Sequence, residues 1–128
     1  LIQKVGNGKN PYRIADGSGL SLYNYVTPEL EMRLLRYAYR NSHIYQHLLP
    51  SLPIAGYDGT LKTRMKGTFA EENVKAKTGT VTGVSALAGY CTATNGHQLC
   101  FSMINQGIMK SDSGRNFQNK VCNALCAP

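Results

Sequence analysis

Two short segments carry the residues best suited to chemistry. Residues 16–24 (DGSGLSLYN), termed the serine loop, combine two serines with glycines that permit tight turns. Residues 77–80 (KTGT), termed the KTG segment, lie at the end of a strand that the alternation of residues 74–78 predicts. A hydroxyl and an ammonium group that face one cleft can support proton transfer at an acyl-transfer site. Lys-Thr-Gly alone is a weak signal, but both segments in this order form a strong one.

The two segments resemble motifs of the penicillin-binding enzymes, whose sites combine S-x-x-K, S-x-N and K-T-G elements. Within that group the chain is most similar to the D-alanyl-D-alanine carboxypeptidase/endopeptidase branch, the class C low-molecular-mass penicillin-binding proteins. The likeness extends from Asp16 onward and includes residues 52–61 and 83–89. It implies an α+β fold with helices packed on an antiparallel sheet. Residues 1–128 would then form the C-terminal part of a single β-lactamase/transpeptidase-like domain.

The resemblance also implies a role for each matching residue. Ser21 would relay a proton between the nucleophile and the leaving amine, and Lys77 would hold positive charge beside it. Thr78 would bind the terminal carboxylate of the substrate. Gly79 would let the substrate lie close to the strand edge, and the Thr80 backbone N–H would supply half of an oxyanion hole.

The chain departs from the family pattern in two places. Where S-x-N is usual, the sequence reads Ser21-Leu22-Tyr23-Asn24, so either Asn24 reaches the site through a local shift or Tyr23 takes its position. No serine has a lysine three residues later, and residues 63–66 (TRMK) come too late in the chain. We therefore expect the nucleophile and its base lysine to precede Leu1, and the chain alone to be inactive.

The implied enzyme is a serine-type hydrolase of peptidoglycan peptides that end in D-Ala-D-Ala, and β-lactam antibiotics would acylate its serine. No metal or organic cofactor is implied, and the location would be periplasmic or extracellular. One alternative is a catalytically inactive penicillin-binding-like module, which the absent S-x-x-K motif motivates. Another is a basic nucleic-acid-binding domain, because the net charge is +7. The basic residues are scattered rather than clustered, which argues against nucleic acid. No stretch approaches the roughly 18 apolar residues that span a membrane.

Periodicity predicts the elements that position these segments. Thr27 and Pro28 indicate the start of a helix. The apolar residues that follow at helical spacing, and that should form its buried face, are Leu30, Leu34, Tyr37 and Ala38. A second helix is expected from Ser42 to Leu49, ended by Pro50. Apolar residues make up 42% of the chain, which suits one domain or a piece of one.

The second half of the chain predicts an antiparallel meander that is closed by a helix. Strands are expected from residue 73, over 84–93 and over 98–106, with a turn at 79–83. A polar loop follows at 110–114, and the helix covers 115–126. Its inward residues would be Phe117, Val121, Cys122 and Leu125. One helix can bury only one face of three strands, so the other face would be left exposed unless further chain covers it.

The cysteines and histidines leave several interpretations open. With a two-residue Asn95-Gly96 turn, Cys91 and Cys100 would lie directly opposite each other, which suits either a disulfide or two buried thiols. Cys122 and Cys126 are one helical turn apart and are expected to pack rather than bond. His43 and His47 have the spacing of a metal pair, but no third ligand is nearby, so surface histidines are favoured.

Overall fold

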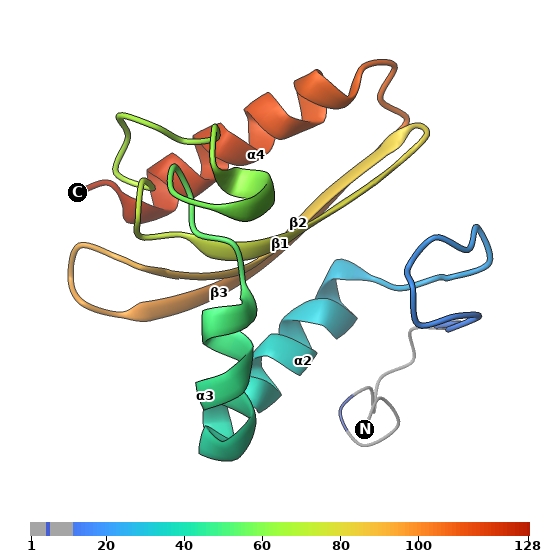
Figure 1. The fold of residues 1–128 in the computed structure, drawn as a ribbon, viewed down its shortest axis with the longest axis horizontal. Helices are drawn as coiled ribbons and strands as arrows, with labels where there is room; N and C mark the ends of the chain where they lie inside the picture. Colours follow the sequence, from blue (N-terminus) through green and yellow to red (C-terminus); the bar gives the residue numbers. More distant parts are fainter. Residues whose placement is uncertain (1–4, 6–11) are drawn as a thin grey trace.

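The computed structural model describes Val5 and residues 12–128. The elements in chain order are helices α2 (Pro28–Arg40) and α3 (Ser42–Ser51), the 3-10 turn η1 (Gly59–Leu61), strands β1 (Lys75–Val81), β2 (Val84–Thr92) and β3 (Gln98–Gln106), and helix α4 (Ser111–Cys126). The strands form one antiparallel sheet in the order β1-β2-β3. Helix α2 lies on one side of the sheet and α4 on the other (Figure 1). The expected α+β class is confirmed.

Helix α2 begins where the sequence predicts. The Thr27 hydroxyl accepts a hydrogen bond from the Leu30 backbone N–H at 3.2 Å, and Pro28 fits the first turn. Leu30 and Ala38 are buried, whereas Leu34 and Tyr37 are only half-buried. Helix α3 continues through Pro50 to Ser51, beyond the expected end at Leu49. A proline in the last turn removes only one backbone donor, so the helix can end after it.

Strand β1 continues through Gly79 to Val81, so the turn expected over residues 79–83 is shorter than predicted. Val81 pairs with Val84, which leaves a two-residue turn in which Gly83 has φ +75°. The alternation expected for β1 is confirmed, because Ala76 is buried while Lys75 and Lys77 share the opposite face. The KTG segment therefore lies within the strand, which extends past the expected end to Val81.

The turn between β2 and β3 has three residues, not two. The Ala93 N–H donates to the His97 carbonyl at 2.9 Å, and Gly96 takes φ +82°. The extra residue shifts the register, so Cys100 pairs with Tyr90 and Cys91 pairs with Leu99. Because neighbouring residues point to opposite faces, Cys91 and Cys100 lie on different sides of the sheet. The hypothesis of a Cys91–Cys100 disulfide is therefore wrong, and all four cysteines are free thiols.

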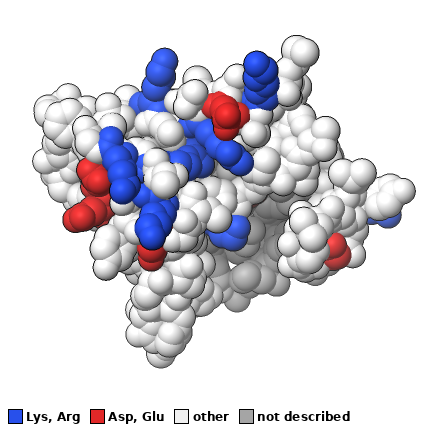
Figure 2. Space-filling model, turned by 45° about the horizontal axis from the view of Figure 1, so that its top comes forward, with Lys and Arg blue, Asp and Glu red and all other residues white. Residues whose placement is uncertain are grey.

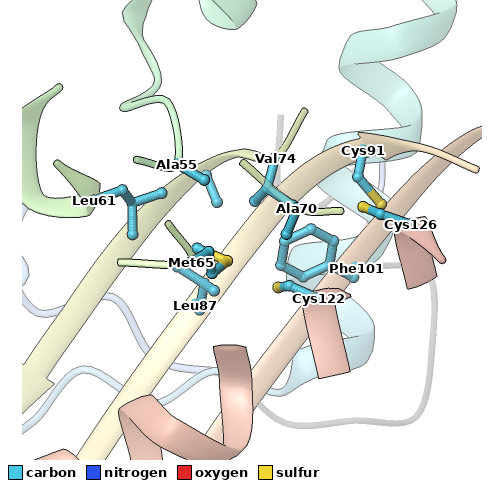
Figure 3. Packing of buried hydrophobic residues seen from close by; sticks show 11 residues of the cluster. Ala55, Leu61, Met65, Ala70, Val74, Leu87, Cys91, Phe101, Cys122 and Cys126 are labelled. Atoms are coloured by element: carbon cyan, nitrogen blue, oxygen red, sulfur yellow. The ribbon is translucent and has the colours of Figure 1, made fainter. Parts of the chain in front are cut away.

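The hydrophobic core lies between the sheet, α4 and the loop at residues 52–74 (Figure 3). Its buried members are Ala55, Leu61, Met65, Ala70, Val74, Ala76, Leu87, Cys91, Phe101, Cys122 and Cys126. Burial of this apolar surface is the main stabilising contribution to the fold. The core fixes β1 and the loop beside it, which together build the candidate site.

Helix α4 begins at Ser111, four residues earlier than expected. Of its predicted inward residues, Cys122 is fully buried, Leu125 packs against the core and Val121 is half-buried. Phe117, which was predicted to point inward, is exposed, whereas Gln118 is fully buried. The Gln118 amide donates to the Ser85 carbonyl at 3.0 Å and to Asn105 Oδ1 at 2.9 Å. Gly114 approaches Ser85 so closely that an added Cβ would lie 3.0 Å from the Ser85 Cβ. The hydrogen-bonded amide of Gln118 and the lack of a side chain at Gly114 therefore determine how α4 packs on the sheet.

No helix in the described part of the chain is long and apolar enough to cross a bilayer.

A groove at the edge of strand β1

A groove of about 760 Å³ joins the serine loop to the KTG segment. Its lining residues are Gly17, Ser18, Gly19, Leu20, Thr60, Thr63, Arg64, Lys77, Thr78, Gly79, Thr80 and Arg115. Four parts of the chain that are distant in sequence thus converge on the outer edge of the sheet. This convergence supports the expectation that the two chemically suited segments face one space.

Only part of the outer edge of β1 has backbone hydrogen-bond partners in the described chain. The Ala76 N–H donates to the Pro53 carbonyl at 3.0 Å, and the Val74 carbonyl accepts from the Ala55 N–H at 2.9 Å. Because hydrogen-bonding direction alternates along an antiparallel strand, the backbone groups of Thr78 and Thr80 also point away from β2. The end of β1 that borders the groove therefore presents an edge on which an extended peptide could pair.

Lys77 and Thr78 have defined polar partners at this edge. The Lys77 ammonium is exposed and donates to the Thr78 carbonyl at 2.7 Å. The Thr78 hydroxyl donates to the Thr60 hydroxyl at 3.0 Å, which links β1 to η1. Gly79 has space around it, because an added Cβ would meet only Ala86 at 3.6 Å.

The groove is cationic. Arg64, Lys77 and Arg115 line it, and no Asp or Glu is among its described lining residues. Arg115 pairs with Asp112 at 3.3 Å, and both side chains are exposed. Lys and Arg side chains also gather on the face that carries α4 and the adjacent loop (Figure 2). A cleft lined by one sign of charge attracts ligands of the opposite sign, so the groove suits a carboxylate.

Arg64 is the groove residue that sequence reasoning missed, since residues 63–66 were considered only as a misplaced motif. Its guanidinium donates to Asn119 Oδ1 at 2.8 and 2.9 Å and to Gln118 Oε1 at 3.1 Å. Burial lowers the pKa of Arg64, yet an arginine remains charged in a protein. Hydrogen bonds to α4 therefore hold a cation at the groove wall. No short motif marks such a residue, because its partners lie far along the chain.

The serine loop is closed by its own polar side chains. The Asp16 carboxylate accepts from Asn24 Nδ2 at 2.7 Å, from the Ser18 hydroxyl at 2.8 Å and from the Gly19 N–H at 3.2 Å. The bond from Asn24, followed by that from Ser18, lowers the pKa of Asp16. Gly19 takes φ +78°, which glycine adopts without steric cost. These contacts present Ser18 and Leu20 to the groove.

The other predicted residues of the loop do not line the groove. The Ser21 hydroxyl accepts from the Tyr23 N–H at 3.2 Å, and Asn24 Oδ1 accepts from the Ala15 N–H at 2.8 Å. The Tyr23 ring lies under the Arg13 guanidinium, 5.4 Å from its centre. Ser21, Tyr23 and Asn24 thus have local structural contacts. Lys77 and Ser18 line the same groove, whereas Ser21 is not among its lining residues.

In Val5 and residues 12–128, no cluster of three or more His, Cys, Asp or Glu side chains could hold a metal ion.

Comparison with known families and proteins gives a consistent match. The D-Ala-D-Ala carboxypeptidase 3 (S13) family matches residues 2–126. The chain is 47% identical over 97 residues to a D-alanyl-D-alanine carboxypeptidase of Actinomadura sp., covering 72% of this chain and 18% of that protein. It is 37% identical over 114 residues to the D-alanyl-D-alanine carboxypeptidase DacB of Haemophilus influenzae, covering 88% and 24%. The chain therefore spans at most a quarter of either relative's length.

Solved structures agree with the sequence comparison. Penicillin binding protein 4 (dacB) from H. influenzae, complexed with a β-lactam, superposes with a TM-score of 0.85 and 33% identity, covering 99% of this chain and 31% of that one. The TLA-1 extended-spectrum β-lactamase gives a TM-score of 0.73 at 24% identity, covering 97% and 50%. The second likeness shows a shared fold, and the helices on an antiparallel sheet are those of this fold.

Proposed function

Because this chain belongs to the D-Ala-D-Ala carboxypeptidase 3 (S13) family, we propose that its parent protein is a serine-type D-Ala-D-Ala carboxypeptidase/endopeptidase that acts on peptidoglycan. Residues 1–128 form the C-terminal part of its single penicillin-binding domain, and another segment supplies the nucleophilic serine and base lysine. The observation that carries the proposal is the cationic groove, where the KTG segment meets the serine loop. The proposed location is the cell envelope, periplasmic or extracellular, and no cofactor is required.

The substrate is a stem peptide that ends in D-Ala-D-Ala, and β-lactam antibiotics occupy the same place. Its extended tail pairs with the outward backbone groups of β1, while Gly79 leaves room for close approach. Its terminal carboxylate is drawn to Lys77 and accepts a hydrogen bond from the Thr78 hydroxyl, which gives up its bond to the Thr60 hydroxyl to make it. The charges of Arg64 and Arg115 add to the attraction, because both residues line the same groove.

The reaction divides into two steps at the scissile carbonyl. The nucleophilic serine oxygen of that other segment attacks the carbonyl carbon. The carbonyl oxygen then gains negative charge and accepts a hydrogen bond from the Thr80 N–H. The C–N bond then breaks, D-Ala leaves with the proton taken from the serine, and an acyl-serine remains. Water next attacks the ester and releases the shortened peptide.

A residue near Lys77 must carry the proton from the serine to the leaving amine. The family likeness points to Ser21 with Asn24 beside it, whereas the groove is lined by Ser18. To act, Ser21 would have to exchange its hydrogen bond with Tyr23 for one with the substrate. We therefore propose a relay by the serine loop, with Ser21 and Ser18 as the two candidates to be separated by substitution.

The test uses the full-length parent protein. Purified enzyme is incubated with an N-acyl-D-Ala-D-Ala peptide, and D-Ala release is measured with and without a β-lactam. We expect release that the β-lactam abolishes, and no release of the terminal L-Ala from the matched N-acyl-D-Ala-L-Ala peptide, which is followed by its own L-Ala assay. Binding without release or acylation would support the catalytically inactive module instead. Absence of both binding and release would refute the assignment.

A further inference from the structure

Three thiols meet in the core between β2 and α4. Cys91 in β2 and Cys126 at the end of α4 are only 2% and 3% exposed, and Cys122 is fully buried. The sulfur atoms of Cys91 and Cys126 face each other, while Cys122 lies beside Phe101 (Figure 3). None of these residues takes part in the proposed reaction. Their arrangement therefore needs a separate explanation.

Direct contact singles out one pair among the three. The sulfur atoms of Cys91 and Cys126 lie side by side, whereas the sulfur atom of Cys122 lies apart from both (Figure 3). The two residues come from different elements, whereas Cys122 and Cys126 are neighbours on one helix. A covalent bond between β2 and the end of α4 would thus constrain the fold, whereas one within α4 would not.

We propose that Cys91 and Cys126 form a disulfide that ties α4 to the sheet when the parent protein folds in an oxidising compartment. The compartment rests on the proposed function, but the choice of partners rests only on the positions of the sulfurs. Two thiols become one S–S bond, and the two protons and two electrons pass to a disulfide oxidant such as oxidised glutathione, which becomes two thiols. Cys100 and Cys122 remain free.

The bond forms most readily before the core closes. Desolvation by burial raises the pKa of Cys91 to about 12 from an ordinary value of 9.0, and burial also raises that of Cys126. At neutral pH, Cys91 then has much less thiolate than an unburied cysteine, and the thiolate is the reactive form. Folded, reduced protein should therefore oxidise slowly, and refolding protein much faster.

The experiment maps the bond in the full-length parent protein. Reduced, unfolded protein is refolded with oxidised glutathione, alkylated under denaturing conditions without reductant, digested and analysed by mass spectrometry. We expect the peptides that contain Cys91 and Cys126 to be linked, and those of Cys100 and Cys122 to be alkylated. The unfolding temperature should be roughly 5–10 °C higher than that of the reduced form, because the crosslink restricts the unfolded chain.

Two variants test the choice of partners. Cys126→Ala should lose both the linked peptide and the increase in unfolding temperature, whereas the matched Cys122→Ala should keep both. Recovery of Cys91 and Cys126 as alkylated thiols, or a link from Cys91 to Cys122, would overturn the proposal. If a variant does not fold, the peptide map of the unsubstituted protein decides.

Fluorescent β-lactam labelling of the same samples reports on the proposed function separately. A linked pair in a protein that is not labelled would contradict the enzyme assignment and leave the disulfide standing. A labelled protein in which Cys91 and Cys126 are free thiols would contradict the disulfide and support the enzyme assignment.

Discussion

Lys75 and Lys77 lie on the same face of β1 but border different spaces. Lys77 lines the groove, where its ammonium donates to the Thr78 carbonyl. Lys75 borders a separate cavity, together with Tyr39 and Tyr45. The two lysines carry the same charge and lie on the same face of the same strand, but they border different cavities. They therefore form a matched pair for testing the role of charge in the groove.

We expect Lys77→Ala in the parent protein to lower kcat/KM for D-Ala release by about 10²- to 10³-fold, the usual effect of removing one electrostatic contact at the reacting groups. Lys75→Ala should change it by less than about threefold, because Lys75 borders a separate cavity and does not line the groove. Steady-state kinetics with the D-Ala-D-Ala peptide measure both. Equal effects of the two substitutions would mean that general positive charge, not the groove, matters.

The two serines of the serine loop allow a second comparison. If the loop relays the proton, one of Ser18→Ala and Ser21→Ala should lower kcat by about 10²-fold or more while the other leaves it nearly unchanged. The geometry favours Ser18, because it borders the groove and Ser21 does not. Single-turnover acylation by a chromogenic β-lactam distinguishes a loss of chemistry from a loss of binding. If neither substitution has an effect, the relay comes from outside residues 1–128.

At the scale of elements, β1 and β2 depend on a close contact at Gly89. A Cβ on this residue would lie 2.2 Å from the Lys75 carbonyl oxygen and 2.6 Å from the Ala76 Cα, so backbone would have to move. The opposite holds at Gly79, where an added Cβ meets only the Ala86 side chain at 3.6 Å. One glycine is thus required by packing, and the other leaves space for substrate.

We expect Gly89→Ala to lower the free energy of unfolding by about 2–3 kcal/mol, because overpacking against a fixed backbone cannot relax. Gly79→Ala should leave stability within about 1 kcal/mol but lower substrate affinity, since its new methyl group enters the groove. Urea unfolding of the parent protein measures the first effect, and KM measures the second. A Gly89→Ala variant as stable as the unsubstituted protein would show that the strands can separate at this point.

Helix α4 and the loop at residues 52–74 are joined by a polar network rather than by apolar packing alone. The buried Gln118 amide binds β2 and β3, and its carbonyl oxygen accepts from Arg64. A partly satisfied network of this kind would cost stability, so its members determine one docking position for α4. The same contacts place the Arg64 charge at the groove.

At the scale of the whole molecule, the two faces of the sheet are covered unequally. One face is buried beneath α4 and the loop at residues 52–74, whereas Ala86, Ala88 and Ile104 on the other are only half-buried. Helix α2 touches that second face through two polar bonds, from the Tyr90 hydroxyl to the Leu35 carbonyl and from the Ser102 hydroxyl to Glu31. This agrees with the expectation that one helix buries one face.

A fluorescent β-lactam should label the full-length parent protein covalently and should not label residues 1–128 expressed alone. Acylation needs a serine that is activated by a neighbouring base, and no Ser-x-x-Lys sequence occurs between Leu1 and Pro128. Gel fluorescence after denaturation detects the covalent product. A clear band on the short chain would place the nucleophile within it.

Much of the fold could be predicted because its signals are local. The Thr27 cap, the alternation before Lys77 and the helical spacing after Pro28 each depend on a few neighbouring residues. Predictions that a shift of one residue would change were wrong in two places. A third residue in the loop after Ala93 separated Cys91 from Cys100, and the packing of α4 on the sheet buried Gln118 instead of Phe117.

The sequence by itself determined the two chemically suited segments, the types of the elements and the family resemblance, since residue identity and spacing carry that information. Only the tertiary structure decided that Ser18 rather than Ser21 borders the groove, that Arg64 joins Lys77 there, and that Cys91 faces Cys126. Each of these facts depends on how segments far apart in the chain pack together. Dihedral preferences and periodicity act over a few residues and do not contain that information.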